Sequence, residues 1–157
     1  MFTARLLCVG RCKHKFVREG EEEYRKRCTS WLKIEIEELN TERLGKISSA
    51  NLKDREGEMI LEKISPRDHV ILLDERGKQF TSVEFANLLQ KISNSGNSGA
   101  TFIVGGADGV SPAVIERANR QISLSPLTFP YQLARLLLVE QLYRASTIIT
   151  GKEYHRA

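Results

Sequence analysis

The chain has 157 residues, of which 41% are hydrophobic and 28% charged, a balance typical of one globular domain spanning residues 1–157. The formal net charge of +4 permits a polyanionic partner but does not require one. No apolar run reaches the roughly 20 residues of a membrane span. Three cysteines, an odd number, favour a reducing cytoplasmic setting over a disulfide-bonded secreted one.

The first half of the chain predicts two strands and two helices. Residues 2–9 alternate apolar and polar side chains, which is typical of a strand rather than of a signal peptide. Residues 19–31 are acidic early and basic late, the polarity that a helix dipole favours. Residues 32–39 predict a second strand, and residues 50–64 a helix that ends before Pro66. A basic cluster lies between the first strand and the first helix: Arg11, Lys13, His14, Lys15 and Arg18.

The second half predicts three short buried strands, at residues 69–73, 101–104 and 122–124. A helix between the first two begins with the capping-box pattern of Thr81 and Glu84. Another begins at Ser111-Pro112, with serine as the cap and proline first, and runs to about Arg120. Strands and helices thus alternate, which predicts an α/β fold with a mostly parallel sheet and helices on both faces.

An apolar loop at residues 124–130 and the helix after it stand out from the rest of the chain. Pro126 and Pro130 exclude regular structure in the loop, so its backbone groups are free to meet a ligand in a pocket wall. The helix begins at Pro130 and ends at Gly151. Its residues 136–139 are apolar on every side, which predicts burial on more than one side, with a second subunit as the second partner.

Three candidate ligand contacts follow strands whose carboxyl ends meet at one edge of a parallel sheet: Leu73-Asp74, Gly105-Gly106 and residues 124–129. Glycine after a strand lets a ligand approach the backbone, although a tight turn alone also explains it. The glycine spacing is not that of a dinucleotide-binding fingerprint. The sequence therefore predicts a pocket that does not bind a dinucleotide.

The cysteine and histidine positions do not predict a metal site. Cys8, Cys12, His14 and Cys28 have no familiar zinc-binding spacing. His155 differs, because it lies in a polar tail between Tyr154 and Arg156, where no packing pattern explains it. Proton handling, RNA contact and a solvated chain end all remain open for this imidazole.

Several C-terminal motifs together resemble one known family. They are Gly105-Gly106-Ala-Asp-Gly109-Val-Ser-Pro, Leu124-Ser-Pro-Leu-Thr-Phe-Pro130, Arg135, Glu140-Gln-Leu-Tyr-Arg144 and Tyr154-His-Arg156. This combination is similar to the ribosomal RNA large subunit methyltransferase H family, small SPOUT-class enzymes that methylate N3 of a pseudouridine in large-subunit (23S-type) ribosomal RNA. The resemblance extends over the whole chain and is least specific in its first third.

The resemblance implies an α/β fold with a C-terminal trefoil knot, a homodimer, and S-adenosylmethionine bound in the knot. It makes the final helix a dimer interface. It also implies a set of cofactor contacts: Leu73, Gly105, Leu124, Ser125, Pro126, Leu127, Thr128 and Phe129. The pocket expected from the strand ends lies at the same positions.

The resemblance further implies roles for charged and polar residues near the end of the chain. His155, Tyr154 and Arg144 become the candidate catalytic residues, with His155 as base or as a group that positions the substrate. Arg135 and Arg156 become candidate RNA contacts, and the partner is ribosomal RNA or an assembled ribosome. Two rival functions stay open, a non-catalytic rRNA-binding module that binds no cofactor and a SPOUT methyltransferase that acts on tRNA, usually with an extra RNA-binding domain.

Overall fold

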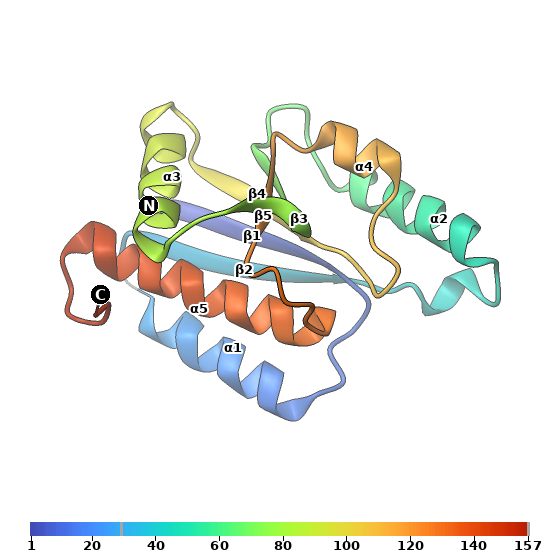
Figure 1. The fold of residues 1–157 in the computed structure, drawn as a ribbon, viewed down its shortest axis with the longest axis horizontal. Coiled ribbons are helices and arrows are strands. Elements are labelled where there is room, and N and C mark those ends of the chain that lie inside the picture. The colour runs from blue at the N-terminus through green and yellow to red at the C-terminus, as the bar shows by residue number, and fades with distance from the viewer. Residues whose placement is uncertain (29, 157) are drawn as a thin grey trace.

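One five-stranded sheet forms the centre of the molecule in the computed structural model, which describes residues 1–28 and 30–156 and, within them, omits the side chains of residues 43 and 49. The strand order is β2-β1-β4-β3-β5, and neighbouring strands run parallel (Figure 1). The strands are β1 Phe2–Val9, β2 Leu32–Leu39, β3 Val70–Gln79, β4 Gly99–Val104 and β5 Arg120–Ser123. Among the described residues, no helix is both long enough and apolar enough to cross a membrane.

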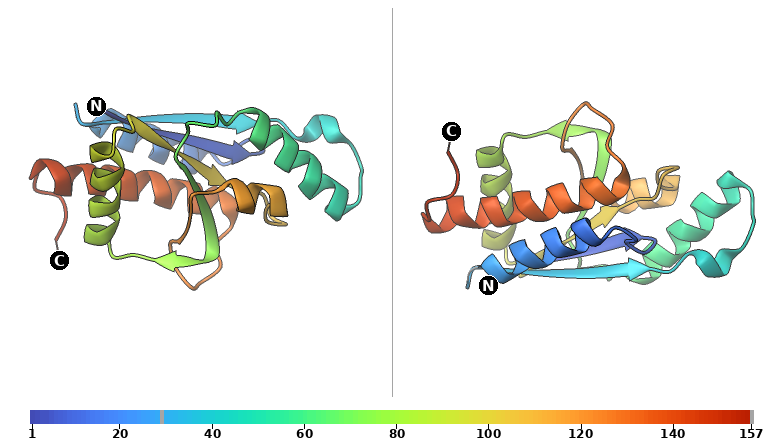
Figure 2. Two further views of the ribbon diagram at one scale, coloured as in Figure 1. Left: turned by 90° about the horizontal axis from the view of Figure 1, so that it is seen from above. Right: turned by 90° about the horizontal axis from the view of Figure 1, so that it is seen from below.

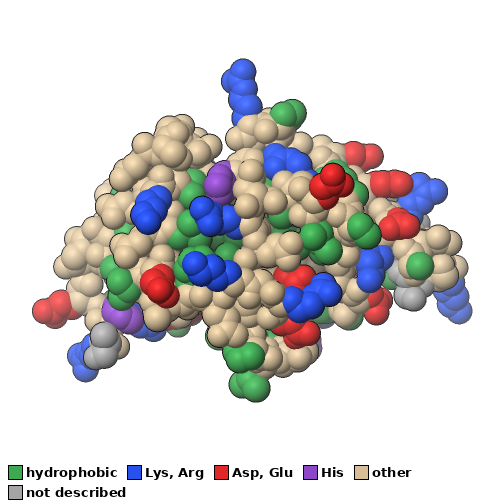
Figure 3. Space-filling view, turned by 45° about the horizontal axis from the view of Figure 1, so that its top comes forward, with side chains coloured by type: hydrophobic (Ala, Val, Ile, Leu, Met, Phe, Trp, Pro, Cys, Tyr) green, Lys and Arg blue, Asp and Glu red, His purple; other side chains and the backbone are tan. Residues whose placement is uncertain are grey.

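Helices cover both faces of this sheet (Figures 1 and 2). On one face lie α1 Lys15–Arg27, α3 Ser82–Asn94 and α5 Tyr131–Thr150, and on the other α2 Ser49–Glu62 and α4 Pro112–Arg117. A short 3-10 helix, η1 Glu42–Leu44, precedes α2. The predicted α/β class with a parallel sheet is confirmed. In the view of Figure 3, hydrophobic side chains reach the surface in separate areas among charged ones.

Two hydrophobic cores, one on each face, hold the helices to the sheet. Alternate residues of β1 point to opposite faces, so Leu6 belongs to the core under α3 and α5, and Leu7 to the core under α2 and α4. Leu6, Leu7 and Leu138 of α5 are fully buried. The central strands carry apolar side chains toward both faces, which explains why their sequences read as continuous apolar runs.

Helices α1 and α4 differ from the sequence prediction. Helix α1 runs from Lys15 to Arg27 and includes part of the basic cluster, whereas the sequence placed it at residues 19–31. Helix α4 ends at Arg117 rather than near residue 120. There the Asn119 amide oxygen accepts the backbone N–H of Val70 at 2.7 Å, which draws the chain into the sheet as β5.

Strand β3 continues past its predicted end through an irregular stretch. Both Leu73 and Lys78 are register partners of Ile122 in β5, so residues 74–77 bulge away from the regular pairing. A Cβ atom on Gly77 would lie 2.7 Å from backbone atoms of Gln121 and Ile122, so only glycine fits where the two chains pass. The trefoil knot itself stays a prediction.

The final helix is held by a buried ion pair that corrects one expectation. Arg135, expected to contact RNA, is only 2% exposed. Its guanidinium donates hydrogen bonds to Glu21 of α1 and Glu38 of β2, each at 3.0 Å. A cation enclosed in this way has no surface to offer to a phosphate, so Arg135 acts as a structural link between α5, α1 and β2.

Replacing Arg135 with methionine should lower the free energy of unfolding by about 3–5 kcal/mol, because Glu21 would remain as a buried carboxylate without its cation. Urea unfolding followed by circular dichroism measures this change. The control is Lys26→Ala, which removes an exposed pair with Glu22 and should shift the midpoint little. Equal losses in the two variants would show that the buried pair does not hold α5 in place.

Candidate functional site

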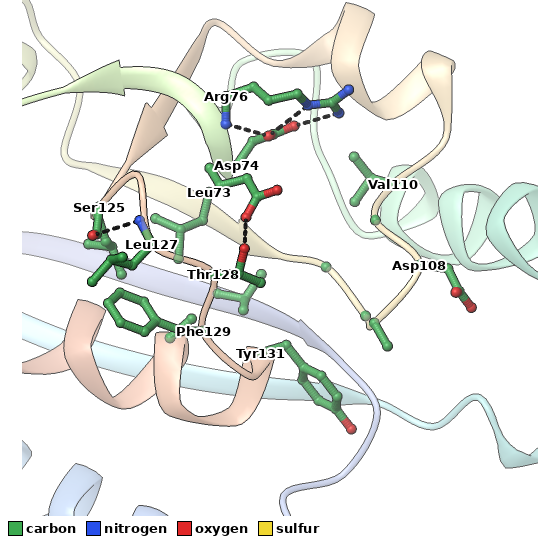
Figure 4. A pocket seen from close by; sticks show the side chains of 18 residues that line it. Leu73, Asp74, Arg76, Asp108, Val110, Ser125, Leu127, Thr128, Phe129 and Tyr131 are labelled. Atoms are coloured by element: carbon green, nitrogen blue, oxygen red, sulfur yellow. Dashed lines mark hydrogen bonds and ion pairs between the residues drawn. The ribbon is translucent and has the colours of Figure 1, made fainter.

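A cavity of about 440 Å³ opens at the carboxyl edge of the sheet, beyond the end of β4 and beside the bulge where the regular pairing of β3 stops. Its walls come from residues 73–76, residues 104–110, the loop around residues 124–129 and the first turn of α5 (Figure 4). Parallel sheets bind their ligands beyond the carboxyl ends of the strands. The cavity therefore lies at the edge of the sheet where the sequence predicted a binding site.

Most of the residues expected to contact the ligand meet at this cavity, although they come from three distant segments. Pro126 is the exception and does not line it. The other seven expected residues do: Leu73, Gly105, Leu124, Ser125, Leu127, Thr128 and Phe129. Their common location supports a single binding site built from all three segments.

Side chains hold the loop at residues 124–129 and pair with only part of its backbone. The Ser125 hydroxyl accepts the backbone N–H of Leu127 at 3.0 Å, the Ser125 carbonyl accepts the Ser123 hydroxyl at 2.9 Å, and Thr128 donates to Glu75 of the β3 bulge at 2.8 Å. In the part of the chain that the structure describes, no backbone–backbone hydrogen bond involves these six residues. The remaining N–H and C=O groups can therefore pair with a polar, planar ligand, while Leu127, 70% exposed, leaves apolar surface at the mouth.

The glycine-rich turn after β4 forms the opposite wall. Gly106 and Gly109 bridge to each other, and Gly109 has a positive φ of 81°, which favours glycine. Gly105 is needed for a reason that the sequence did not suggest. A Cβ atom there would meet Cγ1 of Val110 at 2.8 Å, so glycine allows the turn to close on itself as well as a ligand to approach.

Two carboxylates near this turn have pKa values that their surroundings shift in opposite directions. A hydrogen bond from the Arg76 guanidinium lowers the pKa of Asp74, which stays ionised at the cavity edge. Burial, and then the charge of Asp108, raise the pKa of Glu56 of α2, whose carboxylate lies behind Gly106. Asp108 itself lines the cavity and is exposed, with its carboxylate turned away from Thr128 and Tyr131 (Figure 4).

Asp108 and Tyr131 are among the residues that line the cavity without having been predicted as contacts. Asp108 lies inside the glycine-rich turn, and its closeness in sequence to the predicted contact Gly105 could have identified it as a lining residue. Tyr131 follows the apolar loop directly and points toward the chain after β1 (Figure 4). A Cβ atom on Gly10 would lie 3.9 Å from the Tyr131 hydroxyl, a long-range proximity that no sequence pattern reveals.

The candidate catalytic residues form a second group at the far end of α5. The Tyr154 hydroxyl donates to Glu140 at 3.1 Å, and the Arg144 guanidinium donates to the same carboxylate at 3.0 Å. Arg144 also lies over the Tyr154 ring at 4.7 Å and 3.4 Å from Nδ1 of His155. Burial raises the pKa of the Tyr154 phenol, so the hydroxyl stays protonated. The tail is thus folded against the helix, with Arg156 exposed beyond it.

The two groups do not meet within one chain. Helix α5 has 20 residues, a length of about 30 Å at the usual helical rise. The cavity lies at the start of α5 and the tail at its end (Figure 1). A second chain in antiparallel orientation would bring a tail to each cavity, a geometry that one protomer cannot provide.

The cysteines are free thiols in this structure. Burial raises the pKa of Cys8 to about 12 and that of Cys28 to about 11, so both thiols are neutral near pH 7. Cys12 is buried beside Gln132 of α5. No cluster of three or more potential metal ligands occurs among the described residues.

Comparison with known proteins assigns these features to a family of enzymes. Residues 2–155 match a family model described as "Predicted SPOUT methyltransferase". A protein from Desulfitobacterium hafniense is 42% identical over 160 residues, covering 99% of this chain and 100% of that protein. One from Bacillus pumilus is 44% identical over 155 residues, covering 96% and 98%. One from Enterococcus faecalis is 42% identical over 156 residues, covering 97% and 98%. All three are named Ribosomal RNA large subunit methyltransferase H.

Replacing Gly105 with valine should weaken the binding of S-adenosylmethionine roughly tenfold or more, because overpacking of a close contact costs on the order of 1–3 kcal/mol. Isothermal calorimetry measures the affinity, and circular dichroism checks the fold. The matched test compares Gly105→Ala alone with Gly105→Ala plus Val110→Ala, since the second change removes the methyl group that a Cβ atom would meet. Unchanged affinity in a folded Gly105→Val protein would show that the ligand binds elsewhere.

Proposed function

The chain belongs to the SPOUT methyltransferase family, and from that premise we propose that it transfers a methyl group from S-adenosylmethionine to N3 of a pseudouridine in large-subunit ribosomal RNA. The observation that carries the proposal is the cavity at the bulge of β3 and the carboxyl end of β4, walled by a loop that keeps backbone groups unpaired and available to a ligand. The names of the full-length relatives point to the same substrate class. The reaction belongs in the cytoplasm, where bacterial ribosomes lie.

The residues of the cavity fit S-adenosylmethionine. A volume of 440 Å³ falls within the range of about 300–1,000 Å³ usual for ligand pockets. Leu124, Leu127 and Phe129 offer apolar surface to the adenine, and the backbone around them offers hydrogen-bonding partners to its polar edge. When bound, the cofactor supplies an electrophilic methyl group on a sulfonium.

The protein then has to orient the pyrimidine and help N3 lose its proton. Alignment of the two reactants supplies much of the rate gain, and acid–base help typically adds about 10²–10⁴-fold. The guanidinium of Arg144 can only donate, so its 3.4 Å approach to Nδ1 of His155 favours the neutral tautomer with hydrogen on Nε2. In that form His155 donates a hydrogen bond to a substrate oxygen. Its base role requires the ring to leave Arg144.

We propose that the active site is completed by the tail of a second subunit. Within one chain, Tyr154 and His155 lie at the opposite end of α5 from the cavity. An antiparallel homodimer brings each tail to the cavity of its partner. The exposed Arg156 then meets the RNA backbone beside the target nucleotide. This arrangement makes dimerisation a condition for methyl transfer.

The outer side of α5 provides the surface for such a dimer. Of the four apolar residues at 136–139, Leu138 and Val139 are fully buried against the sheet. Leu136 packs at Gly20 of α1, where a Cβ atom would meet its Cδ1 at 2.8 Å. The sheet and α1 therefore already account for much of the apolar character that suggested an interface. Leu137, half-buried, remains for a second subunit, together with Leu133 one turn earlier.

A transfer assay tests the proposed function against its rivals. The protein is incubated with labelled S-adenosylmethionine and, separately, with large-subunit rRNA, the assembled subunit, the whole ribosome and tRNA, and the modified base is mapped. Label at N3 of a pseudouridine in rRNA or ribosome is the expected result. Label in tRNA would favour a tRNA methyltransferase. Binding of rRNA without cofactor binding would favour a non-catalytic module.

Deleting residues 154–157 should lower methyl transfer a hundredfold or more while leaving dimerisation and cofactor affinity near wild type, because the deletion removes acid–base or positioning help alone. Single-turnover transfer and calorimetry measure the two effects. His155→Ala should reproduce most of the loss. His155→Gln separates the two roles, since an amide still donates a hydrogen bond but does not take up a proton near neutral pH. Full activity of the truncated protein would reduce the tail to a solvated chain end.

A mixed dimer tests whether the tail acts across subunits. One subunit carries the truncation and the other carries Gly105→Val, so a site built in trans leaves one cavity with neither defect. Recovery of activity relative to either homodimeric variant is the expected result. Activity no greater than that of the two homodimers would place each tail at its own cavity.

A charge at Leu137 should separate the subunits, because burying it at an interface without a partner costs several kcal/mol. Leu137→Glu is expected to sediment as a folded monomer. Leu138→Glu is the matched comparison, and it should unfold the protein because Leu138 is fully buried within one chain. Sedimentation velocity and circular dichroism distinguish the outcomes. A monomeric wild-type protein at micromolar concentration would exclude the dimer.

A further inference from the structure

The basic cluster in the connection after β1 and the first turn of α1 lies next to the cavity, although none of its residues lines it. Figure 1 shows this connection passing beside the first turn of α5. The Sγ atom of Cys12 donates to Oε1 of Gln132 at 3.5 Å. Gln132 in turn donates to the hydroxyl of Tyr131, which lines the cavity. The cluster is therefore close to the place where the target nucleotide would enter.

Two buried side chains fix the conformation of this connection. Cys12 is 1% exposed and Val17 is completely buried. The Arg18 guanidinium donates to the backbone carbonyl of Cys12 at 2.8 Å, and the backbone N–H of Val17 donates to the backbone carbonyl of His14 at 3.2 Å. The side chains of the four residues between Cys12 and Val17 are all exposed. The buried side chains of Cys12 and Val17 hold the backbone in place, and the side chains between them face the solvent.

An aromatic ring lies among cations on this outward side. Phe16 is 60% exposed, and its ring centroid lies 5.6 Å from that of His14. In the sequence, Lys13 precedes His14 and Lys15 lies between His14 and Phe16, with Arg11 two residues before Lys13. The nearby carboxylates compensate only in part, through exposed pairs of Lys13 with Glu42 at 4.0 Å and of Lys15 with Glu19 at 3.5 Å.

We propose that this surface, formed by Arg11, Lys13, His14, Lys15 and Phe16, binds an unpaired RNA nucleotide adjacent to the target pseudouridine. The base of that nucleotide stacks on Phe16, and the lysines neutralise the phosphates on either side of it. Proteins that hold single-stranded nucleic acid combine these two elements, aromatic platforms for bases and cations for the backbone. The inference rests on the proposed function, since it names how the same RNA is held beside the cavity.

Charge favours RNA over a second protein copy as the occupant. Protein interfaces are depleted in lysine, especially at their apolar cores, whereas Lys15 directly precedes this ring in the chain and Lys13 lies three residues before it. A nucleotide has a π-face for the ring and carries phosphates for the cations, so it uses both features at once. A protein partner would cover the apolar ring but would have to desolvate the flanking ammonium groups.

The ring itself is tested with variants that keep or remove its π-face. Phe16→Leu keeps an apolar side chain but loses the stacking platform, and Phe16→Trp keeps a platform. We expect Phe16→Leu to raise KM for ribosomal RNA and Kd for a single-stranded oligouridylate about tenfold. Phe16→Trp should leave both constants near wild type. The affinity for S-adenosylmethionine, measured by calorimetry without RNA, should stay the same in both.

The cations are tested through the salt dependence of binding. Lys13→Ala combined with Lys15→Ala should reduce the slope of log Kobs for the oligouridylate against log salt by about 0.7 for each phosphate that the lysines no longer neutralise. Lys91→Ala, an exposed lysine on α3 away from this connection, is the matched control and should leave the slope unchanged. An unchanged slope in the double variant would overturn the proposal.

The outcomes separate this proposal from the proposed function. Wild-type KM and oligouridylate affinity in Phe16→Leu, with methyl transfer intact, would overturn the surface alone. Absence of transfer to any ribosomal RNA by the wild-type protein would overturn the function, while the oligouridylate measurements still report on the surface. A shift to monomer in Phe16→Asp, with oligouridylate affinity unchanged, would make Phe16 a contact between two copies of the chain and would also overturn the proposal.

Discussion

The buried guanidinium of Arg135 is the contact on which the geometry of the site depends. It joins α5 to α1 through Glu21 and to the edge strand β2 through Glu38. Because Arg135 lies one turn after Tyr131, the pair also fixes the place where the loop at residues 124–129 must end. An ion pair enclosed in this way tolerates little movement, since either partner left alone would be a buried charge. The ion pair therefore fixes the position of the first turn of α5, which forms part of the cavity wall.

The cavity has walls held in place by tertiary contacts, and one of them carries backbone groups that make no backbone–backbone hydrogen bond. Two strand ends and a glycine turn define its floor, and Gly77 lets β5 pass against the bulge of β3 at backbone distance. The loop that follows has its turns held by Ser125 and Thr128 rather than by its own backbone. This division leaves peptide groups available to a ligand without a flexible loop, so little ordering is needed when the ligand binds.

Helix α5 links the two functional groups and also separates them. Its first turn belongs to the cavity, and its last turns hold Arg144 and the tail. A helix is stiff, so one chain cannot close this gap by bending, whereas twofold symmetry closes it without strain. In the proposed dimer, the same helix would set the position of the cofactor, the distance between the subunits and the orientation of His155.

The sequence by itself determined the alternation of strands and helices, the helix caps at Thr81 and Ser111, and the segments after the strands that line the cavity. These features depend on local periodicity and on short-range hydrogen bonds, which neighbouring residues specify. The trefoil knot and the cofactor came only from the resemblance to a family. Tertiary structure alone decided that Arg135 is buried, that Gly105 packs against Val110, and that the basic connection after β1 lies beside Tyr131. The contacts of Arg135 and of the basic connection join segments that lie far apart in the chain, and the Gly105 contact depends on how the turn after β4 closes, so none of them follows from local periodicity.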